Sequence, residues 1–455
     1  MSKNSFKNPF TTIKAAYRAA LYLAQILLAV AVSCFAMAHD SKTGIFGFTP
    51  IPESANKANW NPKAPWLIPE GFSQSIVADE TALNIYGGGI NDWNDMNTVN
   101  ETGTSAGRYL YRTHEVRCGV FWAPFPLCGA YPGGAVSVVD LKTGHASILA
   151  QDPSYQALDG IRWSPWGTIL FAEETAGGRL FEIVLDKKDR TKGAVYNRPA
   201  VGRMAHEGIA VGPDGAIYVV DEWRGLSAEC PDGTLPCGGG IYRFIPEKPG
   251  DLSSGALYVL GVSATPEGEH NTGQGAWLGP IDAATARESG SEAGGASYQR
   301  PEDLEIIGDT LYVAVTEGPR DEAGNELFEG RVLAINLDSM MVTNFIKPGV
   351  NAPIEKGKPG EEGFQAGMDS VDNLAATPDG KLMIVEDNNP SDIWVADMDH
   401  NGDGQADNVW LFGSLSDPGA EGTGIYFGKD PQTLFVNIQH SVNKDGDATW
   451  AITRE

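Results

Sequence analysis

A β-hairpin is predicted by the stretch Val371-Asp-Asn-Leu-Ala-Ala-Thr-Pro-Asp-Gly-Lys-Leu-Met-Ile-Val-Glu-Asp-Asn388. A short apolar strand, Leu374–Thr377, leads into the turn sequence Pro-Asp-Gly, and a second apolar strand, Leu382–Val385, follows it. Because the strands of a hairpin are antiparallel, the start of the first and the end of the second lie at the same end. That end is expected to carry the polar side chains Asp372, Asn373, Glu386 and Asp387.

The same pattern recurs along most of the chain. Four further copies and one half-copy each place acidic or amide residues at the ends of the predicted strands, and the pairs end at Glu115, Glu174, Glu222, Glu317, Asp387 and His440. These ends are roughly 48 to 95 residues apart, in the range of propeller repeats or longer. Since a single sheet unit of this kind cannot bury both of its faces, the repeats predict an all-β chain folded as one six-bladed β-propeller domain.

The polar strand ends are then expected to converge at one mouth of the central channel. Acids at the starts of strands (Asp159, Glu207, Glu302 and Glu421) would join those at the ends, and a shared metal or ligand site is predicted there. The alternative is that each acid only keeps an exposed edge soluble.

The N-terminal segment resembles a secretory leader. Residues 1–38 contain four basic residues, an apolar run over Leu21–Val32 and the small-residue sequence Ala36-Met-Ala38, which predict a cleaved signal peptide and a periplasmic or secreted protein. An uncleaved anchor and a lipid-modified Cys34 are the alternatives. Residues 39–71 are expected to form an irregular arm and residues 72–455 the propeller, in which Thr449–Thr453 could pair with the N-terminal segment.

The composition is strongly acidic. Cleavage of the leader would take the formal net charge from −26 to −30. A chain of this charge repels nucleic acid and anionic membranes, so we expect neither as a partner once the leader is removed, and we expect a monomer. Two polar stretches, Gly87–Gly107 and Ser263–Gln299, are expected to be a loop and a blade connection or cover near the mouth.

Four cysteines remain after the leader, as the close pairs Cys118/Cys128 and Cys230/Cys237. Export makes two loop disulfides the predicted arrangement. Thiolate ligation of a metal is the alternative, although neither pair has the spacing of a zinc finger.

A separate acidic loop lies between the predicted strands Ile393–Val395 and Asn408–Phe412. Its residues Asp399, Asn401, Asp403 and Asp407 match the D-x-N-x-D-G core of calcium loops, but position twelve is Trp410 rather than glutamate. A second calcium site and an ordinary polar hairpin tip both fit this pattern.

Several phrases stand out together between about Arg108 and the C-terminus, and they are Pro165–Thr168 with Glu173-Glu174, Gly202–Glu207, Ile241–Leu260, Arg300–Asp303, Asp372-Asn373 and Leu434–His440. In content and in order they resemble the PhoX family of alkaline phosphatases. The resemblance implies an exported six-bladed propeller with a metal cluster at the channel mouth. It also implies hydrolysis of small phosphomonoesters with calcium ions and an iron pair.

The resemblance also implies roles for individual residues. Arg300 matches an arginine that contacts the phosphate, and with Glu302 it forms the predicted catalytic pair, whose side chains alternation places on one face of a strand. The residues that match metal ligands are Glu174, Glu207, Glu302, Asp372 and Asn373, with either Asp221 or Glu222 as another.

This sequence departs from the family at one position. Asp159 stands at about the place of a cysteine that iron-containing members carry, which leaves the iron pair open. A calcium-dependent lactonase or esterase propeller and a non-catalytic propeller held together by calcium are the alternative functions. Glu207-Gly208 and Asp372-Asn373 fit a lactonase equally well, whereas Arg300–Glu302 and Asn437–His440 favour PhoX.

Overall fold

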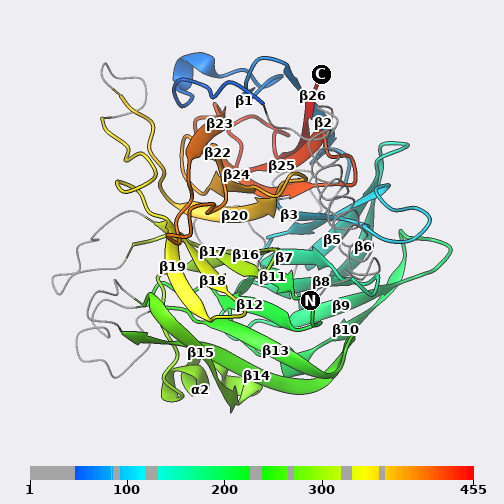
Figure 1. Ribbon diagram of the computed structural model, residues 1–455. Helices are drawn as coiled ribbons and strands as arrows, with labels where there is room; N and C mark the ends of the chain where they lie inside the picture. The colour runs from blue at the N-terminus through cyan, green and yellow to red at the C-terminus, as the bar shows by residue number, and fades with distance from the viewer. Residues whose placement is uncertain are drawn as a thin grey trace, which may run out of the picture. The chain divides into compact units, whose positions relative to one another are not determined.

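Antiparallel strands make up nearly all of the regular structure in the computed structural model of the chain (Figure 1). It describes residues 47–83, 85, 93–117, 132–225, 238–264, 271–318, 330–357 and 364–455. The chain divides into the units Met1–Thr43 and Gly44–Glu455, and every described residue belongs to the second. The predicted signal peptide and all four cysteines of the predicted disulfides lie outside the described residues.

The described strands form five sheets, and two of them are simple four-stranded meanders. The first contains β3 (Asn94–Val99), β4 (Tyr109–His114), β5 (Gly134–Asp140) and β6 (His145–Asp152). The second contains β7 (Leu158–Trp163), β8 (Ile169–Glu173), β9 (Leu180–Leu185) and β10 (Gly193–Asn197). In both, the first strand is buried and the last strand is more exposed, since β6 is mostly partly buried and β10 is mostly exposed.

A nine-stranded sheet follows in the chain. One part contains β11 (His206–Val211), β12 (Ile217–Asp221), β13 (Ile241–Lys248), β14 (Asp251–Ala264) and β15 (Gly273–Ile281). The other contains β16 (Pro301–Ile307), β17 (Thr310–Val315), β18 (Arg331–Asn336) and β19 (Met341–Ile346). The two parts join where Gly273 and Gln274 of β15 pair with Val342 and Met341 of β19.

Each of the last two sheets combines strands from the C-terminal part of the chain with one strand that lies before β3. The predicted hairpin is confirmed as β20 (Val371–Ala376) and β21 (Leu382–Glu386), which continue into β22 (Asp392–Ala396), β23 (Val409–Leu415) and β1 (Trp66–Leu67). The final sheet contains β24 (Glu421–Phe427), β25 (Thr433–Gln439), β26 (Ala448–Arg454) and β2 (Phe72–Asp79). The predicted pairing of the C-terminal strand with the N-terminal segment is confirmed, from Phe72 opposite Arg454 to Asp79 opposite Ala448.

The fold is therefore all-β and propeller-like, but its sheets are not six separate blades. Four sheets are separate, and the fifth is the nine-stranded one, because the extra strand β15 bridges two neighbouring units. β15 lies in Ser263–Gln299, which was expected to be only a connection or a cover. This segment also holds the 3₁₀ turn η4 (Ala283–Thr285) and α2 (Ala286–Glu292), while η1 (Lys57–Asn59) and η3 (Pro199–Val201) lie elsewhere.

Six strands, here called the first strands, pack against one another in a closed circuit within the described structure. In order they are β3, β7, β11, β16, β20 and β24, and β24 contacts β3 again. Figure 1 shows β7, β11 and β16 side by side. The circuit therefore brings together strands that are spread along the chain between Asn94 and Phe427.

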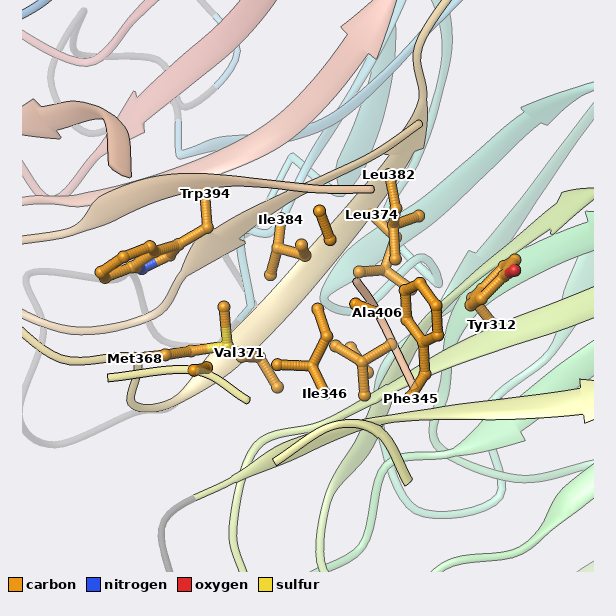
Figure 2. Close-up of a cluster of buried hydrophobic side chains, with 14 of the residues drawn as sticks. Tyr312, Phe345, Ile346, Met368, Val371, Leu374, Leu382, Ile384, Trp394 and Ala406 are labelled. Carbon is orange, nitrogen blue, oxygen red and sulfur yellow. The ribbon is translucent and has the colours of Figure 1, made fainter. Parts of the chain in front are cut away.

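Apolar side chains fill the spaces between neighbouring sheets. Figure 2 shows one such cluster between β17–β19 and β20–β22, where Tyr312 and Phe345 lie with ring centroids 4.7 Å apart and Leu374 and Ile384 pack nearby. Full burial of side chains of this size contributes roughly 1.5–3 kcal/mol each. Among the described residues, no helix has the length and apolar character needed to cross a membrane.

Candidate metal centre

Each first strand carries one extra residue at nearly the same place. The pairing with the next strand shifts between Asn94 and Asn97, Leu158 and Ile161, His206 and Ile209, Pro301 and Leu304, Val371 and Leu374, and Thr423 and Tyr426. A β-bulge of this kind bends the strand and re-aims its side chains. In five of these six described strands, the first bulged residue is an acid: Asp95, Asp159, Glu207, Glu302 or Asp372.

The bulges interlock with their neighbours around the circuit. A Cβ on Gly160 would lie 1.7 Å from the carbonyl oxygen of Glu207, and one on Gly208 would lie 2.5 Å from the Cα of Asp303. Only glycine permits such close approach of two backbones. Further round, Leu374 N donates to Asp303 Oδ2 at 2.9 Å, and Gly424 N donates to Asn373 Oδ1 at 2.5 Å.

Left-handed backbone precedes four of the first strands in the described structure. Trp93, Ala157, Arg300 and Ser370 have φ values of 40°, 44°, 52° and 49°, each directly before a first strand. Such conformations cost of order 1–3 kcal/mol for ordinary residues and persist where the surrounding structure imposes them. They cluster at functional sites, as these do.

The bulges and strand ends gather nine acids that we call the carboxylate cluster. Ligand oxygens of Glu207, Glu302 and Asp372 lie within 4.8 Å of one another, and all three residues are buried. The other members act electrostatically on these or on one another, and they are Asp95, Asp159, Glu174, Glu222, Asp387 and Glu421.

Burial and mutual repulsion make most of these acids hard to ionise. Burial raises the pKa of Asp95 to about 6, of Glu302 to about 7 and of Glu174 to about 8. Burial, with nearby negative charge, lifts the pKa values of Asp159, Glu207, Asp372 and Glu421 well above their usual range. Burial also opposes ionisation of Asp387, yet hydrogen bonding with Glu421 and the charge of Arg300 hold its pKa below the usual value.

Two arginines contact the cluster. Arg300 Nε donates to Glu222 Oε1 at 2.6 Å, and its Nη2 lies 3.0 Å from Glu302 Oε1 and 3.4 Å from Asp387 Oδ2. Arg117 Nη2 donates to Glu174 Oε2 at 3.0 Å and forms an ion pair with Glu115. Both side chains are partly exposed, 22% for Arg300 and 28% for Arg117.

Comparison with known proteins identifies the family. The sequence profile of the alkaline phosphatase PhoX matches residues 178–441, more than half of the chain. The chain belongs to the PhoX alkaline phosphatase family. Members of the PhoX family are metal-dependent phosphatases, and the carboxylate cluster is a donor set of the kind that such an enzyme requires.

One solved structure shows the same fold, and two others are more weakly similar. Pseudomonas fluorescens PhoX in complex with vanadate, a transition state analogue, is 18% identical with a TM-score of 0.63, and the match covers 90% of this chain and 98% of that one. A PQQ-bound aldose sugar dehydrogenase from Streptomyces coelicolor is 15% identical (TM-score 0.44; 85% and 99% covered). Virginiamycin B lyase from Staphylococcus aureus is 12% identical (0.42; 84% and 99%). We find no match among curated proteins.

The structure brings most of the predicted PhoX ligand residues together, but not Asp221. At three strand ends the last strand residue turns away from the cluster and the next residue joins it, as alternation requires. Asp221 is fully buried and accepts from Arg287 Nη2 at 2.6 Å, whereas its neighbour Glu222 holds Arg300. The other two turned-away acids are Glu173, held by Arg179, and Glu386, held by Trp394 Nε1.

Asn373 lies beside the cluster with its amide already engaged. Its Oδ1 accepts from Gly424 N and lies 2.7 Å from Thr423 Oγ1, while its Nδ2 donates to Asp372 Oδ1 at 2.9 Å. In this arrangement Asn373 ties two first strands together and orients Asp372.

The loop with Asp399, Asn401, Asp403 and Asp407 is not brought to the cluster. It connects β22 to β23 at the end of the sheet opposite Asp387. Asp399 accepts from the backbone N–H groups of Gly402 at 2.6 Å and Gly404 at 2.7 Å, and Asn401 Nδ2 donates to Asp407 Oδ1 at 3.0 Å. Its side chains therefore hold the turn itself.

Sequence reasoning missed Asp95, Thr316, Thr423 and Gln439. Thr423 Oγ1 donates to Asp95 Oδ1 at 2.6 Å, Gln439 Nε2 lies 3.3 Å from Asp95 Oδ2, and Thr316 Oγ1 donates to Glu302 Oε1 at 2.6 Å. Asp95 lies in the polar stretch that was expected to be a loop but contains β3. The available signal was the missing first half of the sixth hairpin, where Asp95 corresponds to Asp372.

The cluster residues fit a resident metal. Asp159 is 5% exposed, and its Oδ1 is buried with no hydrogen-bond partner among the described atoms. An unpaired carboxylate oxygen in such a place is costly unless a proton or a cation occupies it. Carboxylate oxygens are the donors that hard cations prefer.

Proposed function

We propose that this PhoX-family chain is a calcium-dependent phosphomonoesterase whose cations are held by the carboxylate cluster. The observation that carries the proposal is the convergence of five bulged acids beside a partly exposed arginine. Asp159, Glu174, Glu207, Glu302 and Asp372 would supply most of the ligands, with Glu222, Asp387 and Glu421 around them. Bound cations supply neutralisation of the phosphoryl group and stabilisation of charge at the attacking and leaving oxygens.

The donor set favours calcium. All nine acids of the cluster offer oxygen, the donor type that calcium takes in flexible arrangements of six to eight ligands. The iron pair that the PhoX resemblance implies is the second metal to be sought, and Asp159, rather than a thiolate, would be its ligand here.

Arg300 is proposed to bind the phosphoryl group of the substrate. Its guanidinium offers parallel N–H donors that suit two phosphate oxygens. Glu222 and Glu302 hold the Nε and Nη2 atoms of the guanidinium, at 2.6 and 3.0 Å. Because the backbone of Arg300 is left-handed directly before β16, the side chain is directed back over Glu302 on the same strand.

The setting of the site is part of the proposal. We count the nine-stranded sheet as two blades, which gives six blades for the six first strands. We propose a signal peptide over residues 1–38, an arm over 39–71 and a propeller over 72–455. We also propose loop disulfides, a periplasmic or secreted location and a monomeric state. The substrate would be a small phosphorylated molecule, and the protein would bind neither nucleic acid nor, stably, a membrane.

Two substitutions test the proposal. Glu302→Gln keeps the shape of the side chain but removes its charge, so bound calcium and hydrolysis of p-nitrophenyl phosphate should fall together. Arg300→Lys keeps the charge but loses the paired donors, so calcium content should stay normal while turnover falls at least about tenfold. Arg243→Lys, in a pair with Asp214 away from the cluster, is the control and should change neither.

Measurements on the wild-type protein could also contradict the proposal. Metal content is measured on purified protein, and hydrolysis is assayed with calcium alone and with calcium plus iron. A wild-type protein that binds these metals but hydrolyses no phosphomonoester would leave only a binding propeller.

A further inference from the structure

The second arginine at the cluster, Arg117, lies on a firmly held segment just after β4. Glu115 N donates to Trp93 O at 2.8 Å, and Ala157 N donates to Val116 O at 3.1 Å. Val116 is fully buried against Ile85, Trp93 and Ala135. The segment is therefore tied to the entries of both β3 and β7, and the base of the Arg117 side chain is fixed.

The guanidinium of Arg117 is only partly used. One terminal nitrogen, Nη2, makes the contacts to Glu174 and Glu115. Its Nε is buried and has no hydrogen-bond partner within the described structure. A buried donor without a partner costs about 1–3 kcal/mol, so this arrangement is expected only where another acceptor arrives. The side chain as a whole is 28% exposed.

Arg117 and Arg300 approach the cluster from different sheets. Arg117 contacts the acids after β4 and β8, and Arg300 contacts those of β12, β16 and β21. Glu174 and Glu222, the partners of the two arginines, interact electrostatically with each other. The positive charge at the cluster is thus divided between two arginines, one after β4 and one before β16, each paired with acids.

Cations bound to the acids would change what the arginines face. Glu174 and Glu302 would offer their carboxylate oxygens to such a cation, and oxygens so engaged would attract the guanidinium groups less strongly. The freed N–H groups need a new acceptor, and an oxyanion with several oxygens can serve both arginines at once. An uncharged or singly accepting substrate, such as a lactone, cannot do so.

We infer that Arg117 is a second anion-binding arginine, which acts with Arg300 on the phosphoryl group of the substrate and of the phosphate product. The inference rests on the proposed function, because it concerns the same site. It makes the enzyme selective for dianionic phosphate groups and open to inhibition by inorganic phosphate.

The test compares Arg117→Lys with Arg108→Lys in the full chain loaded with calcium. Arg108 lies at the other end of β4, where its partner is Asp140, so its replacement should leave both constants and the calcium content unchanged. The quantities measured are KM for p-nitrophenyl phosphate, the inhibition constant for inorganic phosphate, calcium content and melting temperature. Arg117→Lys keeps the counter-charge for Glu174 and Glu115 but loses the planar set of donors. It should raise KM and the inhibition constant about tenfold, with calcium content and melting temperature as in wild type.

Two results would overturn the inference. If both constants stay within about twofold of wild type, Arg117 serves only as a counter-ion. If calcium content or melting temperature changes and the constants do not, its role is structural. If the wild type hydrolyses no phosphomonoester, the proposed function fails. Titration of inorganic phosphate into calcium-loaded wild type and calcium-loaded Arg117→Lys then tests separately whether Arg117 binds phosphate. Weaker phosphate binding by Arg117→Lys would retain the inference, and equal or absent binding would remove it.

Discussion

The tight contact at Gly160 gives a quantitative test of the bulged circuit. A Cβ at this position would lie 1.7 Å from the carbonyl oxygen of Glu207, whereas ordinary contacts of a Cβ begin at 3.4 Å. The backbone of Gly160 is not left-handed, so alanine can adopt its conformation. The steric contact with Glu207 is therefore what would destabilise the variant. In Gly160→Ala, β7 and β11 must therefore separate by about 1.7 Å.

That separation reaches the metal ligands directly. Overpacking costs typically 1–3 kcal/mol, and we expect about 3 kcal/mol here because both groups are backbone and neither can rotate away. Glu207 also contributes a carboxylate to the cluster, and metal–ligand distances tolerate only about 0.2 Å. In Gly160→Ala we therefore expect calcium binding and turnover to be lost, in addition to the loss of stability.

The assay is thermal unfolding with and without calcium, together with calcium content. Wild type should gain about 2.7 kcal/mol at calcium concentrations one hundred times the dissociation constant, and Gly160→Ala should not. Gly380→Ala is the matched control, since Gly380 has φ of 82° in the β20–β21 turn and nothing within 4 Å of an added Cβ. It should cost about 1 kcal/mol in backbone strain and keep the full calcium gain. A Gly160→Ala protein with normal calcium content and turnover would refute the reasoning.

Two further predictions concern the acids. In cation-free protein the pKa values of Asp95 (about 6), Glu302 (about 7) and Glu174 (about 8) lie above those of the unfolded chain. The folded state then binds more protons, so the free energy of unfolding should be greatest near pH 4 and fall as pH rises through 6 to 8, and calcium should reverse the fall. Melting curves in chelator that do not change with pH would contradict this. Asp221→Asn should cost about 3 kcal/mol, because Arg287 loses its buried partner, with calcium content unchanged. A loss of calcium in this variant would place Asp221 in the metal site.

Local sequence signals predicted the hairpins but not the bulges. The Pro-Asp-Gly turn and the apolar runs around it are contained in 18 residues, and β20 and β21 formed as predicted. The extra residue in each first strand has no such signal, because it is imposed by the neighbouring strand. Asn373 illustrates the difference, since its amide is engaged by Gly424, a residue 51 positions away.

The same limit explains what the sequence left open or misplaced at individual residues. β3 has polar residues at four of its six positions, so propensity indicated a loop, but Asn97 Nδ2 donates to Gly424 O at 2.8 Å and to Asn437 Oδ1 at 3.0 Å across the sheets. Adjacent acids such as Asp221 and Glu222 are chemically alike, and only the parity of the strand decides which one faces the cluster. The loop at Asp399 shows that the spacing of a calcium loop also suits a turn that binds its own backbone.

The pairing of β2 with β26 has a consequence for the order of assembly. These strands are separated by more than 360 residues, so the last sheet cannot form until the whole chain is available. Contacts of such long range slow folding, because loop closure must precede them. Glu421 on β24 belongs to that sheet and Asp95 lies on its neighbour β3, so the acids meet only after this closure. Uptake of the cation should therefore mark the final step of folding, and partly synthesised chains should be left with unpaired edges at β2 that favour aggregation.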